Sequence, residues 1–232
     1  MKIDLSIRMK MNASLADDNS RVADIGCDHG YVAMWLAQNK NCNYVIASDV
    51  NDGPIRRAEK NVKAAGLDDG ITVRKGYGLS VLEPGEVDTC IIAGMGGMLI
   101  CEILSNATDI LKTINKLILQ PQSDAEAVRR HIHKLGFRIT DEKICMDGGK
   151  YYISIVAVPG SEETPYTDNE YRFSRILADE GGSIFRSYVK SIIDKLSKLV
   201  EELDSEELSA NERVNGRKEE ILNDLGALKK RL

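Results

Sequence analysis

Apolar runs alternate with amphipathic segments from the start of the chain to about residue 158. Five runs have the continuous apolar character of strands buried on both faces: residues 21–26, 44–50, 71–76, 88–94 and 115–121. Segments with helical spacing separate or follow them, at residues 31–40, 53–66, about 96–112 and about 124–135. Pro54 near the first turn and Gly66 after the last turn mark the two ends of the second helix.

Two further strand-like segments, residues 137–147 and 150–159, are joined by a turn signal at Asp147-Gly148-Gly149. They predict an antiparallel pair at the end of the sheet. The strand–helix alternation before them requires crossover connections, which predict an α/β fold with a mostly parallel seven-stranded sheet covered on both faces. Ligands of such sheets bind at the carboxyl ends of the strands, close to the point where the strand order reverses.

The pattern changes after Pro159, because residues 161–170 are polar and residues 170–232 contain no strand signal. Leucines recur there at helical spacing: Leu196, Leu199, Leu203, Leu208, Leu222, Leu225, Leu228 and Leu232. A new helix is expected to begin within residues 204–208, with Asp204 or Ser205 as its cap. We therefore predict two domains, residues 1–160 and 161–232, the second a helical hairpin that resembles an antiparallel coiled coil.

Composition narrows the class of protein. The 232 residues are 43% hydrophobic, 5% aromatic and carry a net charge of −5, which excludes a uniformly basic nucleic-acid-binding protein but allows a local basic patch. Residues 161–232 hold 12 basic and 16 acidic side chains, so most of the acidity lies in the predicted helical domain.

The cysteine pattern and the apolar runs give an expected location. Five cysteines with no CxxC spacing favour buried free thiols in a reducing cytosol over disulfides or a metal site. No segment approaches the ~20 apolar residues of a membrane span, and no signal peptide opens the chain. We expect a soluble cytoplasmic protein that binds no metal.

Chemistry-bearing residues follow the first strand, in the loop from Asp24 to Gly30. Its D-x-G-x-x-x-G pattern differs from the G-x-G-x-x-G of dinucleotide-binding folds, which aims backbone amides at phosphates. A zwitterionic amino acid on a sulfonium instead needs room and acceptors for its ammonium. Asp24 and Asp28 supply such acceptors, which indicates S-adenosyl-L-methionine (SAM) as the cofactor.

The ends of the next strands extend the predicted cofactor site. Asp49 is placed to accept both ribose hydroxyls, a role that dinucleotide folds share. Gly76-Tyr77-Gly78 would border adenine, and Ala93 to Gly97 would leave an open floor for a methyl acceptor, beside the amides of Gln120 and Gln122. The predicted cofactor-binding residues are Asp24, Gly26, Cys27, Gly30, Asp49, Val50, Gly76, Tyr77, Gly78, Ala93, Gly94, Met95 and Gly96.

Simpler interpretations remain open for each part. Asp24, Asp28 and Asp49 are also residue types that cap helices, and residues 94–97 also suit a tight turn. His29 is equally compatible with a structural role. The cofactor interpretation depends on the co-occurrence of all these loops at one edge of one sheet.

At these residues the chain resembles the bacterial tRNA adenine-22 N1-methyltransferases, which are class I enzymes with a C-terminal helical hairpin. The likeness covers nearly the whole chain. Its motifs are Leu5-Ser6-x-Arg8-Met9, DIGCDHGY at 24–31, Gly53-Pro54 with AEKNVKAAGL, VRKGYGLSVL at 73–82, IIAGMGGMLICEIL at 91–104 and LILQPQSDAEAVRRHI at 117–132. AGMGG followed by LILQPQ is the most specific part. Tyr77 stands where the family usually has an acidic residue.

The resemblance implies a Rossmann-like class I methyltransferase that uses SAM to methylate N1 of an adenine in tRNA. Because this nitrogen carries its own lone pair, transfer depends on positioning and electrostatics rather than on a strong base. The predicted catalytic residues are Asp28, which would stabilise the positively charged product base, with His29 and Tyr31, which would orient or stack it. N1 lies on the pairing edge, so the base must be unpaired or flipped out.

A tRNA partner requires cationic side chains. The predicted RNA-binding residues are Arg8, Lys10, Arg56, Arg57, Lys60, Arg129 and Arg130. Ordinary solvated helix faces are the alternative interpretation of each cluster. The helical arm would help to hold the tRNA through a local stripe of Arg186, Lys190, Lys195 and Lys198. The sequence leaves the oligomeric state open, with a monomer as the default expectation.

Three rival functions are compatible with parts of the pattern. A SAM-dependent methyltransferase of a protein or a small molecule shares every cofactor argument. A non-catalytic RNA- or protein-binding module with a vestigial SAM fold is disfavoured by the intact acidic residues Asp24, Asp28 and Asp49. A nicotinamide oxidoreductase is disfavoured by the glycine spacing of the first loop.

Overall fold

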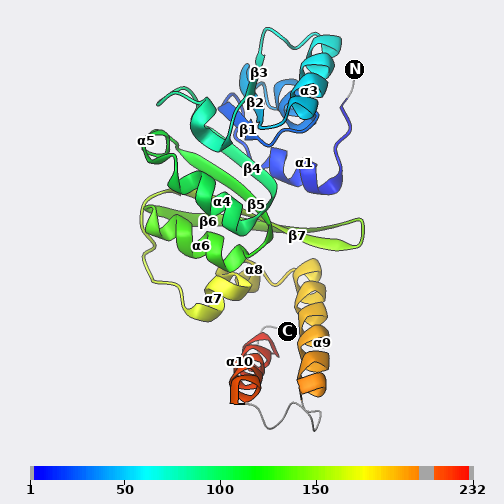
Figure 1. Cartoon of the computed structure of the whole chain (residues 1–232), viewed down its shortest axis with the longest axis vertical. Coiled ribbons are helices and arrows are strands. Elements are labelled where there is room, and N and C mark those ends of the chain that lie inside the picture. The colour runs from blue at the N-terminus through cyan, green and yellow to red at the C-terminus, as the bar shows by residue number, and fades with distance from the viewer. Residues whose placement is uncertain (1–2, 204–211, 230–232) are drawn as a thin grey trace. The chain divides into compact units, whose positions relative to one another are not determined.

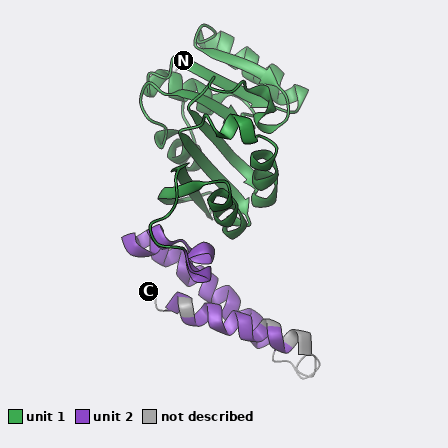
Figure 2. Ribbon diagram, turned by 90° about the vertical axis from the view of Figure 1, so that its left-hand side faces the viewer, with its two compact units in different colours: residues 1–165 green, residues 166–232 purple. Residues whose placement is uncertain are grey.

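A computed structural model describes residues 3–203 and 212–229 of the chain. The chain divides into two compact units, Met1–Pro165 and Tyr166–Leu232, which Figure 2 distinguishes by colour.

The first unit is built on one seven-stranded sheet with the order β3-β2-β1-β4-β5-β7-β6 (Figure 1). Its strands are β1 (Arg21–Ile25), β2 (Tyr44–Asp49), β3 (Ile71–Lys75), β4 (Thr89–Gly96), β5 (Lys116–Ser123), β6 (Phe137–Asp147) and β7 (Lys150–Pro159). The first five strands are parallel, whereas β7 is antiparallel to both β5 and β6. The predicted mostly parallel sheet with a terminal antiparallel pair is confirmed.

Burial explains why the central strands read as continuous apolar runs. In β1 every residue after Arg21 is buried, and in β2 the four residues from Val45 to Ser48 are buried. Their register pairs Ile25 with Ser48 on β2 and with Ile92 on β4. The chain crosses from β3 back to β4 beside β1, so the strand order reverses between β1 and β4. A ligand site is expected outside the carboxyl ends of these two strands.

The helices of the first unit form two groups. One group contains α1 (Ile7–Ser14), α2 (Tyr31–Asn39) and α3 (Asp52–Ala65), in which α2 contacts both α1 and α3. The other contains α4 (Gly97–Ser105), α5 (Thr108–Leu111) and α6 (Ala125–Lys134), in which α4 contacts both others. A short 3-10 helix, η1 (Gly78–Val81), follows β3. The alternation of these helices with parallel strands places the groups on opposite faces of the sheet.

Two helices differ from the sequence expectation. The single helix expected at 96–112 is two helices, because the chain leaves the helical conformation at Asn106 and Ala107. Helix α1 was not expected at all. It begins at Ser6, whose hydroxyl accepts a hydrogen bond from the Met9 amide at 3.4 Å, and it buries Asn12 and Ala13 against the core.

Helix α6 is anchored by a buried ion pair, which corrects one sequence prediction. Arg129 has no exposed surface, its Nε donates to Glu142 Oε1 at 2.9 Å, and its Nη2 lies 2.7 Å from the same oxygen. Glu142 is also fully buried. The prediction that Arg129 binds RNA is therefore wrong, because the guanidinium is enclosed and already paired. The charge pattern of the helix gave no sign that one of two adjacent arginines points inward.

The second unit consists of helices in the part that the structure describes. These are α7 (Asp168–Phe173), α8 (Arg175–Glu180), α9 (Ser183–Leu203) and α10 (Glu212–Lys229). A capping box formed by Thr167 and Glu170 starts α7. Helix α10 contacts α9, as the predicted hairpin requires. The helix start expected at 204–208 lies outside the described residues.

The apolar side chains of α9 and α10 follow the predicted stripe only in part. Phe185, Val189, Ile221, Leu225 and Leu228 are buried. Leu222, which the stripe included, is 48% exposed, because Ile221 takes the inward position on that turn. None of the described helices is long and apolar enough to cross a membrane.

Candidate functional site

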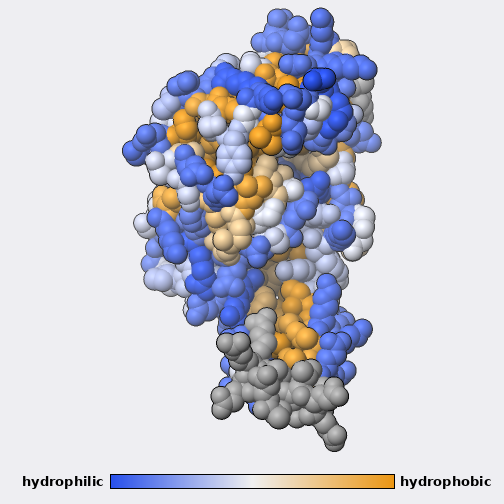
Figure 3. All heavy atoms as spheres, in the orientation of Figure 1, coloured by the Kyte–Doolittle hydropathy of each residue, from blue (hydrophilic) through white to orange (hydrophobic). Residues whose placement is uncertain are grey.

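A cavity of about 180 Å³ opens at the carboxyl ends of β1 to β4. Its wall is formed by Ile25, Gly26, Ser48, Asp49, Val50, Asn51, Gly76, Tyr77, Gly78, Met95, Leu99 and Ile103. Seven of the thirteen predicted cofactor residues are among them, namely Gly26, Asp49, Val50, Gly76, Tyr77, Gly78 and Met95. Apolar surface also interrupts the hydrophilic exterior of the first unit (Figure 3), and the wall residues Val50, Tyr77 and Leu99 are each more than a third exposed.

The loop after β1 contributes Gly26 to the wall of the cavity. The amides of Gly26 and Cys27 both donate to the carbonyl oxygen of Ser48, at 2.8 and 2.9 Å, so the loop is tied to the end of β2. Gly26 has φ +79°, a conformation that side chains rarely adopt. A Cβ atom there would also lie 2.4 Å from Met95 Cε. Glycine thus lets Met95 lie directly against this loop.

Asp24 lies behind this loop and is 4% exposed. The Ala33 amide donates a hydrogen bond to its carboxylate, yet Oδ2 has no partner among the residues that the structure describes. Burial, and to a lesser extent the charge of nearby Asp49, raises the pKa of Asp24 to about 7. An unpaired oxygen on a buried carboxylate is costly to leave without a partner, so this site favours a cationic ligand.

The end of β2 presents a second carboxylate. Asp49 Oδ1 accepts hydrogen bonds from the Asn51 amide at 2.9 Å and the Asn51 side chain at 3.3 Å. Its backbone carbonyl accepts from Gly76 at 3.0 Å, which joins the ends of β2 and β3 at the cavity. The hydroxyl of Ser48 is buried and, within the described chain, lacks a hydrogen-bond partner. Asp49 thus places a partly exposed carboxylate in the cavity wall.

The opposite wall comes from the loop after β3 and from α4. The Tyr77 hydroxyl donates to Glu102 Oε1 at 2.7 Å, and this bond raises the pKa of Tyr77. Leu99 and Ile103 lie one turn apart on α4 and complete the apolar wall. The sequence analysis missed these two residues. Their i, i+4 spacing directly after the Gly94–Gly97 segment was the available signal.

The other six predicted cofactor residues lie near the cavity but are not in its wall. Gly30 starts α2 at φ +72°, with Ala58 of α3 3.3 Å from where a Cβ would be. Cys27 is a buried thiol whose pKa is raised by burial and by the neighbouring carboxylates, so it stays protonated. Gly96 precedes α4 as its N-cap. Asp24, Ala93 and Gly94 lie on the strands behind the wall or beside it.

The three predicted catalytic residues lie together. Asp28 is in the left-handed region at φ +48°, and its 62% exposed side chain lies 2.9 Å from Arg57 Nη2 and 3.4 Å from His29 Nε2. The rings of His29 and Tyr31 are stacked, with centroids 5.3 Å apart and planes 8° apart. The structure thus brings Asp28 together with Arg57, which the sequence had placed in a separate RNA-binding group.

The remaining predicted RNA-binding residues are dispersed over the first unit. Lys10 on α1 and Arg56 and Lys60 on α3 are exposed. Arg130 on α6 is paired with Glu126 at 2.9 Å. Arg8 is only partly exposed and reaches from α1 to the end of β5, where its Nη1 donates to Gln120 Oε1 at 3.0 Å.

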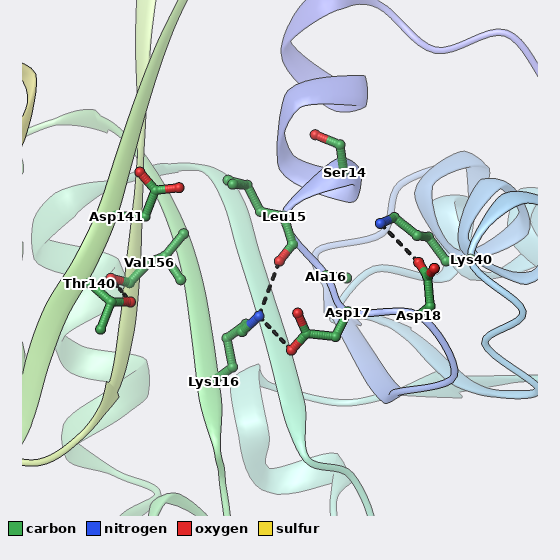
Figure 4. Close-up of a pocket in the computed structure, with 10 residues that line it drawn as sticks. All are labelled: Ser14, Leu15, Ala16, Asp17, Asp18, Lys40, Lys116, Thr140, Asp141 and Val156. Carbon is green, nitrogen blue, oxygen red and sulfur yellow. Dashed lines mark hydrogen bonds and ion pairs between the residues drawn. The ribbon is translucent and has the colours of Figure 1, made fainter. Parts of the chain in front are cut away.

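A larger hollow of about 550 Å³ lies at the opposite edge of the sheet, between the α1–β1 connection and β5 to β7 (Figure 4). Lys116 pairs there with Asp17 at 2.5 Å, and Lys40 pairs with Asp18 at 3.0 Å. The third carboxylate, Asp141, pairs with Lys143 at 3.0 Å. Each charged residue of this wall thus has an ion-pair partner, whereas Asp24 has an oxygen without a hydrogen-bond partner among the described residues.

Two comparisons with known protein sequences identify the same family of enzymes. Residues 22–224 match the family model of TrmK, tRNA (adenine(22)-N(1))-methyltransferase. The chain is 37% identical over 165 residues to the tRNA (adenine(22)-N(1))-methyltransferase of Bacillus subtilis, an alignment that covers 71% of this chain and 69% of that protein.

Solved structures agree with the sequence matches. The crystal structure of the B. subtilis m1A22 tRNA methyltransferase TrmK superposes with a TM-score of 0.90 at 29% identity, covering 99% of both chains. Streptococcus pneumoniae Sp1610 in complex with SAM superposes with a TM-score of 0.87 at 30% identity, covering 99% of this chain and 100% of that chain.

Asp24 generates a prediction for the pH dependence of folding. A carboxyl group whose pKa rises from 3.8 to about 7 on folding holds its proton more tightly in the native state. Its contribution to stability is complete below about pH 4 and is lost as the pH rises through about 7. Relative to wild type, Asp24→Asn should therefore gain stability between pH 5 and pH 8, by up to about 4 kcal/mol.

Urea unfolding of both proteins at several pH values, without added ligand, measures this difference. Asp28→Asn is the matched control, since it makes the same substitution at a carboxylate that is 62% exposed. Parallel pH profiles for Asp24→Asn and wild type would show that Asp24 is ionised in the folded protein.

Proposed function

The chain belongs to the TrmK family of tRNA (adenine(22)-N(1))-methyltransferases, and on this premise we infer that it transfers a methyl group from SAM to N1 of adenine 22 in tRNA. The structural observation that carries the proposal is the cavity at the carboxyl ends of β1 to β4, with the carboxylate of Asp24 directly before the wall residues Ile25 and Gly26 and its Oδ2 unpaired within the described residues.

The residues around this cavity fit SAM. The cofactor has an ammonium and a sulfonium, and the buried Asp24 Oδ2 is an acceptor that lacks a partner within the described residues. We propose that Asp24 holds the ammonium, directly or through water, and that Asp49 accepts the ribose hydroxyls. Tyr77, Leu99 and Ile103 would border the adenine, and Gly26 and Met95 would lie closest to the methionine part.

Bound there, SAM supplies an electrophilic methyl group. The acceptor N1 has a lone pair and carries no proton at neutral pH, so no side chain has to act as a strong base. The protein's task is to hold a flipped-out adenine in line with the methyl group and to exclude water. The adenine gains a positive charge when the N1–carbon bond forms, and side chains that tolerate this charge favour the reaction.

We propose that the loop after β1 supplies those side chains. The stacked rings of His29 and Tyr31 form an aromatic surface beside Gly30, suited to stacking on a base. Asp28 precedes them and carries the negative charge that a methylated adenine would face. Its pairing with Arg57 moderates that charge and orients the carboxylate. Exposed Lys10, Arg56 and Lys60 would contact the RNA backbone.

The residues that we assign to catalysis and to cofactor binding lie in one of the two units. All residues assigned to the cofactor and the adenine belong to the first unit, so we propose that one copy of the chain holds a complete site and acts as a monomer. The sequence-predicted boundary after residue 160 and the role of the helical unit in holding tRNA remain predictions. Activity on tRNA also implies a cytoplasmic enzyme.

Methylation of unmodified tRNA transcripts tests the proposed function directly. With labelled SAM, we expect up to one methyl group per tRNA, recovered as N1-methyladenosine by nucleoside analysis. Primer extension should stop at nucleotide 22, because the methyl group blocks pairing, and a transcript with A22 replaced by G should not be labelled. Methylation at another nucleotide, or only of a protein or small molecule, would refute the assignment.

The proposed role of Asp28 predicts a selective loss. Asp28→Asn should lower kcat by up to about fivefold, because an exposed charge interaction is worth up to about 1 kcal/mol. The dissociation constant of SAM should stay within about twofold, since Asp28 is not in the cavity wall. Single-turnover methylation and calorimetric titration measure the two quantities. An unchanged kcat would remove Asp28 from the chemistry.

A further inference from the structure

The Arg8 side chain joins the first helix to the edge of the sheet where the acceptor must enter. Its Nη1 donates to Gln120 Oε1 at the end of β5 at 3.0 Å. A Cβ atom on Gly94 would lie 3.0 Å from the same nitrogen and 3.8 Å from Gln122 Nε2. Gly94 directly precedes Met95 of the cavity wall. The guanidinium therefore lies one residue away from the cofactor cavity, on its acceptor side.

Three further interactions position Arg8 and its partner Gln120. The Arg8 amide donates to Asp147 Oδ2 at 3.1 Å, which ties the first turn of α1 to the β6–β7 turn. The guanidinium carbon lies 5.1 Å from the ring centroid of Tyr152 on β7. Gln120 is fully buried, and its Nε2 donates to the Pro121 carbonyl at 3.0 Å, so its Oε1 is held toward Arg8. The cation is pre-organised rather than freely mobile.

Arg8 forms no close ion pair with the residues that the structure describes, and its guanidinium contacts an amide oxygen and an aromatic ring. The Asp147 carboxylate accepts a hydrogen bond from the Arg8 amide, and its pKa is lowered mainly by that bond and less by the charge of Arg8. A guanidinium has five N–H donors in a planar fork, and only one is used by Gln120. Such a group, partly buried beside an open site, is suited to donate two parallel hydrogen bonds to an oxyanion.

We propose that Arg8 binds a phosphate that flanks the target nucleotide and so positions the flipped-out adenine at the cavity. This inference rests on the proposed function, because the phosphate is that of the tRNA substrate. A base contact is less suited to Arg8, since the adenine becomes cationic on methylation and a guanidinium beside it would oppose the reaction. A phosphate is negative before and after transfer, and phosphate contacts set the position of a bound nucleic acid.

The same helix offers a comparison residue. Lys10 is exposed and lies two positions further along α1, so it faces another side of the helix than Arg8. It contributes to general attraction of RNA, which weakens evenly with salt. Arg8 differs in being directed at one phosphate, and this difference can be measured.

The test removes the arginine and the phosphate charge separately and together. Single-turnover methylation is measured for wild type, Arg8→Gln, Arg8→Lys and Lys10→Gln. The substrates are unmodified tRNA and two tRNAs that carry one neutral methylphosphonate linkage, either 5′ or 3′ to A22. Calorimetric titration with SAM and thermal unfolding show that each variant is folded and binds the cofactor.

Wild type should lose about tenfold in rate with one of the two methylphosphonate tRNAs, as expected for hydrogen bonds to a charged group. Arg8→Gln should lose about as much on unmodified tRNA and nothing further on that methylphosphonate tRNA. Arg8→Lys should fall between the two, because a lysine keeps the charge but not the fork. Lys10→Gln should lose as much methylation rate with that methylphosphonate tRNA as wild type does, whatever its effect on RNA affinity.

The proposal is overturned if, at both linkages, the methylphosphonate lowers the methylation rate of Arg8→Gln by the same factor as that of wild type. It is also overturned if Arg8→Gln is as active as wild type on unmodified tRNA. If Arg8→Gln does not fold, Arg8→Lys is compared with wild type on the same tRNAs. A methylphosphonate linkage that slows Arg8→Lys as much as it slows wild type would contradict the contact between Arg8 and the phosphate. Failure of the proposed function is a separate result, because wild type would then not methylate A22 in unmodified tRNA.

Discussion

A carboxylate buried at the end of a central parallel strand is the constraint on which the site depends. Asp24 is held in place by the sheet on one side and by the first turns of α2 on the other, where the Ala33 amide reaches it. Oδ2 nevertheless has no partner among the described residues, and burial keeps the pKa of the group near 7. A protein that leaves such a group unpaired stabilises a cation brought by a ligand. The glycines of the loop provide the space in which that ligand can approach.

The site divides its charges between two sides of one sheet edge. On the proposed cofactor side, two carboxylates lie near the carboxyl ends of neighbouring strands, Asp24 on β1 and Asp49 at the end of β2. On the proposed acceptor side, Arg8 and Gln120 meet beside Gly94, and no carboxylate of the described residues forms an ion pair with the guanidinium. In the proposed function, a cationic cofactor and an anionic RNA backbone would therefore be directed to different places. The topological switch between β1 and β4 produces this separation, because it leaves the edge open at that point.

The sequence predicted the elements whose signal is local. The strands were found because buried parallel strands are continuously apolar, and Asp24, Gly26 and Asp49 were found because they end such strands. What escaped depends on distant contacts. Arg129 and Arg130 are neighbours with the same charge, yet only tertiary packing against Glu142 buries the first of them. Helix α1 is weakly amphipathic, and the place of Arg8 is set by Gln120 and Tyr152, more than a hundred residues away.

Proton release on cofactor binding tests the central claim most directly. At pH 6 the amino group of SAM is fully protonated, so any proton released must come from the protein. Calorimetric titration in buffers of different ionisation enthalpy gives the number released. We predict that wild type releases most of one proton, that its affinity rises from pH 6 to pH 8, and that Asp24→Asn binds more weakly and releases none. Equal proton release by the two proteins would contradict the account, because the cofactor would then not be held by the Asp24 carboxylate.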